Sequence, residues 1–327
     1  MLCIFLTILY FHSLVLSNPL PSLDKLQLSP PAMGPEALAF DLEGKGPYTG
    51  VADGRVLKYQ RSIPGFVEFA TTSPHRTKEQ CDGTSDSNLG PICGRPLGLG
   101  FNYLTRELYI VDPYFGLLVV GTYGGLAIHV ATAAEGKPFA FLDGLDIDPL
   151  TGIVYFTDAG DIFRLSNNVT QIILSGDTTG RLLKYDPKSR EVIVLLRGLS
   201  GATGVAVSKD GTFVLVTEFI GCRVRRYWLK GPKANSAEIL INLRGNPDNI
   251  KRMALGDFWV AVNIQNQQGP TPITVAQGQR INKFGMVLET VTLAAEYNGT
   301  SISEVQEYGG ALYIGSLFAN FVGEYRD

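Results

Sequence analysis

The chain has little charge for its length and very few histidines. Of its 327 residues, 18% are charged, the formal net charge is −3, and three are histidines. Without a concentrated basic face there is no electrostatic basis for binding nucleic acid, because binding phosphates needs clustered Lys and Arg. With so few histidines, the sequence gives little support for a two-histidine zinc site or for a histidine-dependent catalytic triad. His12 lies in a segment that we expect to be removed, so only His75 and His129 remain.

Long apolar runs are absent beyond the N-terminus. Residues 1–17 form one apolar run, followed by small and turn-forming residues at Ser17, Asn18 and Pro19. This arrangement is typical of a secretory signal peptide that is cleaved near Ser17. A short membrane anchor is the alternative, although the run is marginal in length for a bilayer, and no later stretch is apolar enough to span one. The sequence therefore predicts a signal peptide at 1–17 and a single mature domain at 18–327.

Cysteine is scarce as well, and its positions suit a secreted chain. Cys81 and Cys93 bracket a polar loop rich in Gly, Ser, Asp and Asn. In an oxidising compartment such a loop favours a disulfide between them, which leaves Cys222 as a buried structural thiol. Asn-x-Ser/Thr sequons at Asn168 and Asn298 predict glycans on surface loops, although sequons also arise by chance.

Glycine, in contrast, is abundant, and a short pattern recurs along the chain. Glycine contributes 37 residues, about 11% of the chain against a usual ~7%, which suits a turn-rich all-β protein. An apolar or aromatic run, often closed by a small or acidic residue, begins at Tyr48, Tyr109, Tyr155, Val214, Trp259 and Tyr313. Each run follows another short strand-like segment and a turn, and the runs are separated by 45 to 61 residues.

Short strands, turn signals and a period near 50 residues are typical of a β-propeller. Six repeats therefore predict an all-β fold, a six-bladed β-propeller with a central channel. Two β-sandwich domains are the main alternative, but they need a linker, and the composition does not shift between residues 140 and 210. We expect residues 30–36 to lead into the first blade, and residues 60–95 and 160–180 to be loop insertions.

The innermost strand of each propeller blade starts near the channel, so its first residues are candidates for a shared site. The equivalent starts fall at Glu36, Leu97, Asp143, Thr203, Asp248 with Asn249, and Glu304. We expect the four carboxylates of this set and Asn249 to converge on one pocket. Converging carboxylates can bind a hard cation such as Ca²⁺, or one of them can act as a general acid/base with a raised pKa. Alternatively, these groups cap turns or bond backbone amides between blades.

The sequence resembles the strictosidine synthase-like proteins of plants over nearly the whole mature chain. The motifs that carry the resemblance include CGRPLG at 93–98, LYIVDPYFGLLVVG at 108–121, TGRLLKYDP at 179–187, GNPDNIKR at 245–252 and LYIGSLF at 312–318. The resemblance implies a six-bladed propeller, a loop disulfide between Cys81 and Cys93, and targeting to the secretory pathway. Delivery to the vacuole is typical of the family; the endoplasmic reticulum and the extracellular space are alternatives.

Strictosidine synthase joins an arylethylamine to an aldehyde in a Pictet–Spengler reaction, and its catalytic glutamate falls on Glu304. The enzyme's preceding histidine and aromatic residue are replaced here by Ile302 and Ser303, and a pocket tyrosine aligns with Asp143. The resemblance thus implies amine–aldehyde C–N chemistry in specialised metabolism, without a cofactor and distinct from strictosidine formation. Glu304 would be the acid/base. The substrate pocket would include Asp143, Ile302, Ser303, Phe141 and Thr203.

Related propellers, resembling the paraoxonases and the adipocyte plasma membrane-associated protein, suggest a second hypothesis. They use a channel calcium to hydrolyse esters, lactones or organophosphates, and their metal ligands fall on Glu36, Asp143, Thr203 and Asp248, with Asn249 beside them. A calcium-assisted hydrolase is therefore the alternative, and a non-catalytic binding glycoprotein is the third hypothesis. In each case we expect a small-molecule partner, no nucleic acid, and a monomer.

Overall fold

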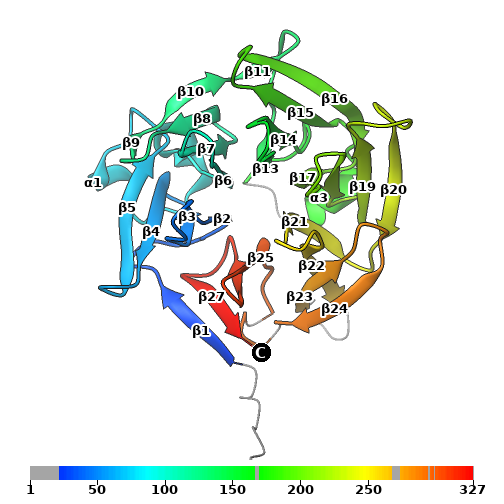
Figure 1. Cartoon of the computed structure of the whole chain (residues 1–327). Coiled ribbons are helices and arrows are strands. Elements are labelled where there is room, and N and C mark those ends of the chain that lie inside the picture. The colour runs from blue at the N-terminus through cyan, green and yellow to red at the C-terminus, as the bar shows by residue number, and fades with distance from the viewer. Residues whose placement is uncertain (1–21, 166–168, 267–272, 294, 298, 327) are drawn as a thin grey trace, which may run out of the picture.

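The protein is a ring of six β-sheets around a central channel, as the sequence predicts (Figure 1). The computed structural model describes residues 22–165, 169–266, 273–293, 295–297 and 299–326. The predicted signal peptide and both sequon asparagines, Asn168 and Asn298, lie outside the described residues and stay predictions. Among the described residues, no helix has the length and apolar character needed to cross a membrane.

Each sheet is one blade, and its strands follow one another from the channel to the rim. Blade 1 contains β2 (Leu38–Ala39), β3 (Tyr48–Gly50), β4 (Arg55–Gln60), β5 (Gly65–Thr71) and, parallel to β5, β9 (Gly125–Leu126). Blade 2 contains β6 (Gly98–Asn102), β7 (Glu107–Asp112), β8 (Gly116–Val120) and β10 (Ile128–Ala131). Blade 3 contains β13 (Leu142–Ile147), β14 (Val154–Asp158), β15 (Gly180–Asp186) and β16 (Glu191–Leu199).

The second half of the ring repeats the same plan. Blade 4 contains β17 (Ala202–Val207), β18 (Phe213–Glu218), β19 (Arg223–Trp228) and β20 (Ala237–Asn242). Blade 5 contains β21 (Asn246–Arg252), β22 (Phe258–Asn266), β23 (Ile273–Ile281) and β24 (Val287–Thr292). Blade 6 contains β25 (Glu304–Tyr308), β26 (Ala311–Gly315), β27 (Phe321–Arg326) and β1 (Ser22–Gln27). A separate hairpin is formed by β11 (Ala133–Ala134) and β12 (Lys137–Pro138).

The recurring apolar motif is the second strand of every blade. All residues of β14, β18 and β26 are buried, since both faces of these strands pack against neighbouring blades. A strand covered on both faces has a continuous apolar sequence instead of an alternating one, which is why the motif stands out. The stretch 60–95, expected to be a loop insertion, also contains the outer strand β5. Because the side chains of β5 are only partly buried, its sequence shows little of the hydrophobic periodicity that indicates a strand.

The N-terminal strand closes the ring. β1 pairs antiparallel with β27, from Ser22 opposite Arg326 to Gln27 opposite Phe321, so the two ends of the chain complete one blade (Figure 1). Leu26 of β1 is buried in the same apolar cluster as Val322 of β27. The proline-rich lead at 30–36 is apparent from the sequence, but this strand is not. β1 is a single short strand with mostly exposed side chains, and it does not belong to the recurring motif from which the other strands were predicted.

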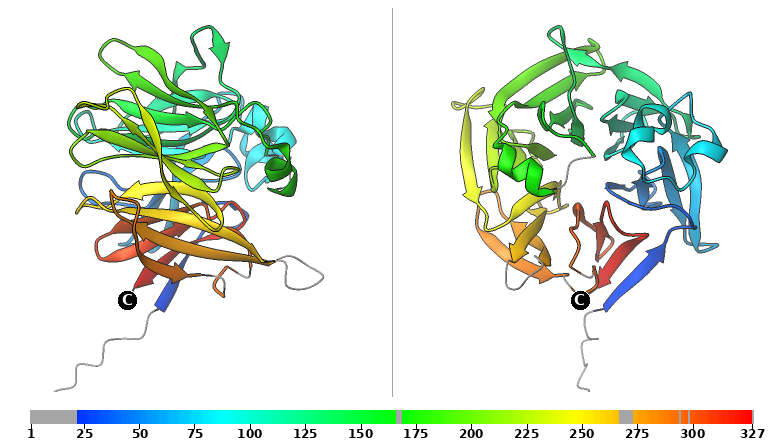
Figure 2. Two further views of the ribbon diagram at one scale, coloured as in Figure 1. Left: turned by 90° about the vertical axis from the view of Figure 1, so that its right-hand side faces the viewer. Right: turned by 180° about the vertical axis from the view of Figure 1, so that it is seen from behind.

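Four short helices gather on one face of the ring, which Figure 2 shows from the side. They are α1 (Lys78–Cys81), the 3-10 helix η1 (Ser87–Leu89), α2 (Gly90–Cys93) and α3 (Val169–Ser175). The predicted disulfide joins Cys81 at the end of α1 to Cys93 at the end of α2. It ties both helices into one compact loop beside the mouth of the channel.

The closure of the ring can be tested with Leu26→Ala. The substitution removes a buried side chain that holds β1 on β27, so we expect the free energy of unfolding to fall by about 2 kcal/mol or more. Urea unfolding followed by tryptophan fluorescence measures the change. Gln27→Ala, at an exposed position of the same strand, is the matched control and should change stability by less than about 0.5 kcal/mol. Equal effects of the two substitutions would show that β1 does not hold the ring closed.

Candidate functional site

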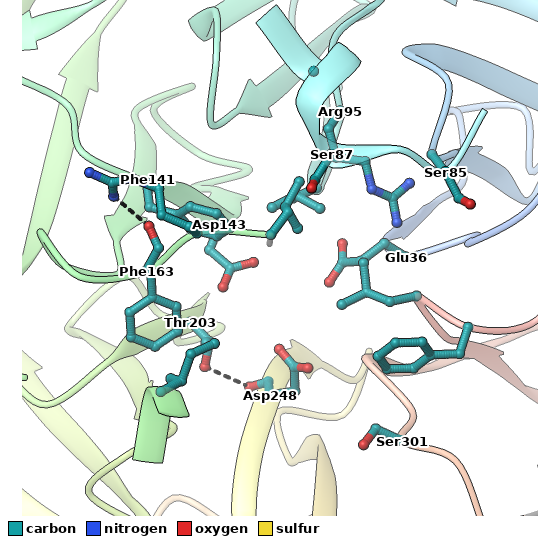
Figure 3. A pocket seen from close by; sticks show the side chains of 18 of the residues that line it. Glu36, Ser85, Ser87, Arg95, Phe141, Asp143, Phe163, Thr203, Asp248 and Ser301 are labelled. Carbon is teal, nitrogen blue, oxygen red and sulfur yellow. Dashed lines mark hydrogen bonds between the residues drawn. The ribbon is translucent and has the colours of Figure 1, made fainter. Parts of the chain in front are cut away.

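Three neighbouring blades bend their first strands in the same way at the channel. β13, β17 and β21 each show a register shift against the second strand of their blade. The shifts fall at Asp143, Thr203 and Asp248 and the residue after each. A bulge re-aims the side chain of the extra residue. Figure 3 shows the side chains of all three residues directed into one cavity.

Threonines on the second strands hold two of these bulges. The Gly144 amide donates to Oγ1 of Thr157 at 2.9 Å, and the Gly204 amide donates to Oγ1 of Thr217 at 2.6 Å. A Cβ atom on Gly144 would lie 2.6 Å from the carbonyl oxygen of Thr203 in the next blade. Glycine is thus required at this close approach of two blades.

Glu36, Asp143 and Asp248 form a cluster of carboxylates, hereafter the acidic cluster. One oxygen of each lies within 4.8 Å of the others. The side-chain amide of Asn249 donates to Oε1 of Glu36 at 3.0 Å. The other carboxylate oxygen, Oε2, is buried without a hydrogen-bond partner among the described residues. Three of the residues that the sequence predicts to converge therefore meet, and Asn249 orients one of them.

Burial and mutual repulsion act together on the acidic cluster. Glu36 is 1% exposed and Asp143 is 7% exposed. Burial, followed by the negative charges of Asp143, Asp248 and Glu304, raises the pKa of Glu36 well above its usual value. Burial raises the pKa of Asp143 to about 7, and burial with the charge of Asp143 raises the pKa of Asp248. A cation bound among the three groups would favour their ionised forms.

The acidic cluster lies in a cavity of about 620 Å³, a size that suits a small organic ligand. Aromatic and aliphatic side chains form much of its wall, among them Phe141, Phe163, Leu165, Ile172, Phe219 and Phe318. The disulfide-tied loop contributes Ser85 and Ser87, and Arg95 follows it. The cavity therefore places a cluster of ionisable carboxyl groups inside a largely apolar wall.

Three of the sequence-predicted pocket residues are not among those that line this cavity. Oε1 of Glu304 accepts a hydrogen bond from the Leu38 amide at 2.8 Å, and its Oε2 lies 3.2 Å from Nζ of Lys251. Burial raises the pKa of Glu304 to about 7, although Lys251 opposes the shift. Ile302 packs in the apolar core between blades, and Ser303 donates to the carbonyl of Glu36. Ile302 and Ser303 therefore support the blades around the acidic cluster, whereas Glu304 is held between Leu38 of blade 1 and Lys251 of blade 5.

Thr203 and Phe141 do line the cavity. Oγ1 of Thr203 lies 3.1 Å from Oγ1 of Thr217, within hydrogen-bond distance, and donates to the Pro247 carbonyl at 3.3 Å. Arg95, which is not among the sequence-predicted site residues, also lines the cavity. The available signal was its position two residues before Leu97, at the start of blade 2.

The acidic cluster fits a hard divalent cation such as Ca²⁺. Calcium takes oxygen ligands at about 2.3–2.6 Å, so two opposite ligands lie about 4.6–5.2 Å apart and adjacent ones are closer. The spacing of the three carboxylates is within this range. The carboxylate oxygen of Glu36 that has no hydrogen-bond partner is available as a metal ligand. Zinc, copper and other softer metals prefer Cys or His ligands, which the acidic cluster lacks.

The family profiles and the similar proteins found by comparison all indicate the same family. The family profile described as "Strictosidine synthase" matches residues 143–232, and "Strictosidine synthase-like, N-terminal" matches residues 18–59. Protein STRICTOSIDINE SYNTHASE-LIKE 11 of Arabidopsis thaliana is 45% identical over 97% of this chain and 95% of its own length. Strictosidine synthase of Catharanthus roseus is 42% identical over 93% of this chain and 86% of its own length.

Among solved structures, a gluconolactonase from Xanthomonas campestris superposes with a TM-score of 0.66 at 12% identity. The match covers 94% of this chain and 89% of that chain. The calcium-binding protein regucalcin from Agrobacterium tumefaciens superposes with a TM-score of 0.62 at 14% identity, over 92% of each chain. At these identities the likeness shows the propeller fold alone.

The raised pKa values predict how stability depends on pH when the cluster holds no cation. The folded protein binds more protons than the unfolded chain between the ordinary carboxyl pKa near 4 and the folded value of about 7 for Asp143. Stability of the chelated protein should therefore fall as pH rises through this window, by on the order of a few kcal/mol, because each pKa unit is worth about 1.4 kcal/mol.

Urea unfolding in the presence of a chelator, at about pH 5 and about pH 7.5, measures this difference. Asp143→Asn should shrink it, and Asp24→Asn, on the exposed face of β1, should leave it unchanged. A pH dependence that is the same in all three proteins would contradict the assigned electrostatics.

Proposed function

The chain belongs to the strictosidine synthase-like family, and from that premise we propose that it is a calcium-assisted hydrolase of small esters or lactones. The observation that carries the proposal is the acidic cluster: three carboxylates meet inside an apolar cavity. One of their oxygens is buried and has no hydrogen-bond partner among the described residues. Buried like charges of this kind are costly unless a cation compensates them.

The residues of the chain have distinct roles in this proposal. Glu36, Asp143 and Asp248 would hold the ion, and Asn249 fixes the orientation of Glu36 through its 3.0 Å hydrogen bond. A bound Ca²⁺ would polarise the carbonyl group of the substrate. The phenylalanine-rich wall binds the apolar part of the substrate and excludes water, which strengthens every electrostatic interaction in the cavity.

Amine–aldehyde condensation with Glu304 as acid/base is the second candidate. One observation favours it: burial raises the pKa of Glu304 to about 7, which suits a group that takes up and releases a proton near neutral pH. The geometry favours it less, because Glu304 faces the Leu38 amide and Lys251 and does not line the cavity. A substrate amine would have to reach it past the acidic cluster.

The disulfide between Cys81 and Cys93 is consistent with the secretory pathway. Within that pathway we propose the vacuole as the compartment, as is typical of the family.

Calcium binding is the first test of the proposal. We expect protein dialysed against calcium-free buffer to retain about one calcium ion per chain by elemental analysis. Calcium added to chelated protein should raise the melting temperature, because a ligand at 100 times its Kd stabilises the folded state by about 2.7 kcal/mol. Asp248→Asn should abolish the rise, whereas Asp210→Asn, in an exposed turn, should preserve it. An identical melt of chelated and calcium-loaded wild type would exclude the metal site.

Activity assays of two variants separate the two candidate functions. On a panel of aryl esters and lactones, Asp248→Asn should lower kcat/KM by at least about a hundredfold, a loss typical of removing transition-state electrostatics. Glu304→Gln should retain most of this activity if it folds, which thermal unfolding checks. Turnover of an amine–aldehyde pair that Glu304→Gln abolishes and Asp248→Asn spares would favour the second candidate instead.

A further inference from the structure

Arg95 is a buried cation that forms no ion pair among the described residues. It is 5% exposed and follows the disulfide-tied loop at the start of blade 2. Its Nη1 donates to the Gly34 carbonyl at 3.0 Å, the one side-chain hydrogen bond recorded for Arg95 among the described residues. No carboxylate oxygen of a described residue lies within 4.0 Å of its guanidinium group.

The other two buried arginines of the described chain differ in this respect. Arg181, 3% exposed, forms an ion pair with Asp158 at 2.5 Å. Arg226, 8% exposed, forms an ion pair with Glu238 at 3.3 Å. These pairs follow the general rule that a buried charge is matched by a counter-charge. Arg95 departs from the rule, and it is also the one of the three that lines the cavity.

An unmatched guanidinium group that faces a cavity is equipped to bind a ligand. A guanidinium group has five N–H donors, and the Gly34 carbonyl uses only one. The remaining donors form the planar fork that matches the two oxygens of a carboxylate. Burial lowers the pKa of Arg95, and the more distant negative charges of Glu36, Asp53 and Asp112 oppose this shift. A ligand anion in direct contact with the guanidinium group would add to their stabilisation of its charge.

The position of Arg95 in the cavity fits a substrate with two different ends. Figure 3 shows its guanidinium group on the same side of the cavity as Glu36, whereas Phe141 and Phe163 lie on the opposite side. The acidic cluster extends from one side to the other, with Glu36 near Arg95 and Asp143 near Phe141. A ligand that spans the cavity would place an anionic group at Arg95, its middle at the acidic cluster and an apolar group against the phenylalanines.

We propose that Arg95 is a specificity-determining residue that binds a carboxylate of the substrate, so that the preferred substrate is an ester or lactone carrying both a free carboxylate and an aryl or alkyl group. The reaction of such a substrate rests on the proposed hydrolase function. Carboxylate recognition by Arg95 does not, and it can be measured on its own.

The test compares 3-phenylpropionate with its neutral analogue 3-phenylpropionamide by titration calorimetry on calcium-loaded protein. We expect the wild type to bind the carboxylate at least about tenfold more tightly, because charge-assisted bidentate hydrogen bonds exceed neutral ones. Arg95→Met should abolish this preference, and Arg95→Lys, which keeps the charge but loses the fork, should reduce it. Arg164→Met is the matched control, since Arg164 also lines the cavity but is exposed, and it should keep the preference.

Each outcome separates this inference from the proposed function. Equal binding of the two compounds by the wild type overturns the inference, even if Arg95→Met fails to fold. A carboxylate preference that survives in folded Arg95→Met, or that Arg164→Met removes, overturns it as well, because the carboxylate would then contact the calcium ion or Arg164. Calcium binding and ester hydrolysis without a carboxylate preference leave the proposed function intact. Arg95-dependent binding in a protein that binds no calcium supports the inference and contradicts the proposed calcium-assisted hydrolase function.

Discussion

The burial of three neighbouring carboxylates is the constraint on which the rest of the site depends. Burial raises the pKa values of Glu36, Asp143 and Asp248 because it disfavours the charged forms. The negative charges of Asp143 and Asp248 add to the rise at Glu36, and the charge of Asp143 adds to the rise at Asp248. The chain would separate these groups if it could move freely. They stay together because each is fixed to a different blade of a closed ring. The apolar cores between blades therefore stabilise an arrangement that is unfavourable in isolation, and a bound cation would relieve it.

Ring closure brings the first of these carboxylates into position. Glu36 precedes blade 1, whereas Asp143 and Asp248 belong to blades 3 and 5. The Ser303 hydroxyl from blade 6 donates to the Glu36 carbonyl at 2.8 Å, and Asn249 from blade 5 donates to its carboxylate. The same N-terminal part of the chain supplies β1, which completes the last blade on β27. Glu36 therefore lies on the segment that closes the ring and is held by contacts with blades 5 and 6.

The family relationship and the local geometry bear on different questions. At 45% identity over nearly the whole chain, the family fixes the propeller and its blade order. It does not fix the chemistry, because one fold supports many reactions through a few residues at its functional site. The resemblance predicts that Glu304 corresponds to the catalytic glutamate of strictosidine synthase. Here, however, its two oxygens face the Leu38 amide and Lys251, and the carboxylates that face the cavity come from other blades.

The sequence by itself determined the propeller, because six mostly buried second strands leave a repeating apolar signal that local chemistry produces without tertiary context. It also determined which strand starts carry Glu36, Asp143, Asp248 and Glu304. Only the tertiary structure decided which of these carboxylates share a cavity. That outcome depends on bulges of a single residue in β13, β17 and β21, and a bulge turns a side chain without changing the repeat. The unpaired charge of Arg95 and the closing role of β1 are likewise properties of contacts between distant segments, and no local pattern in the sequence encodes them.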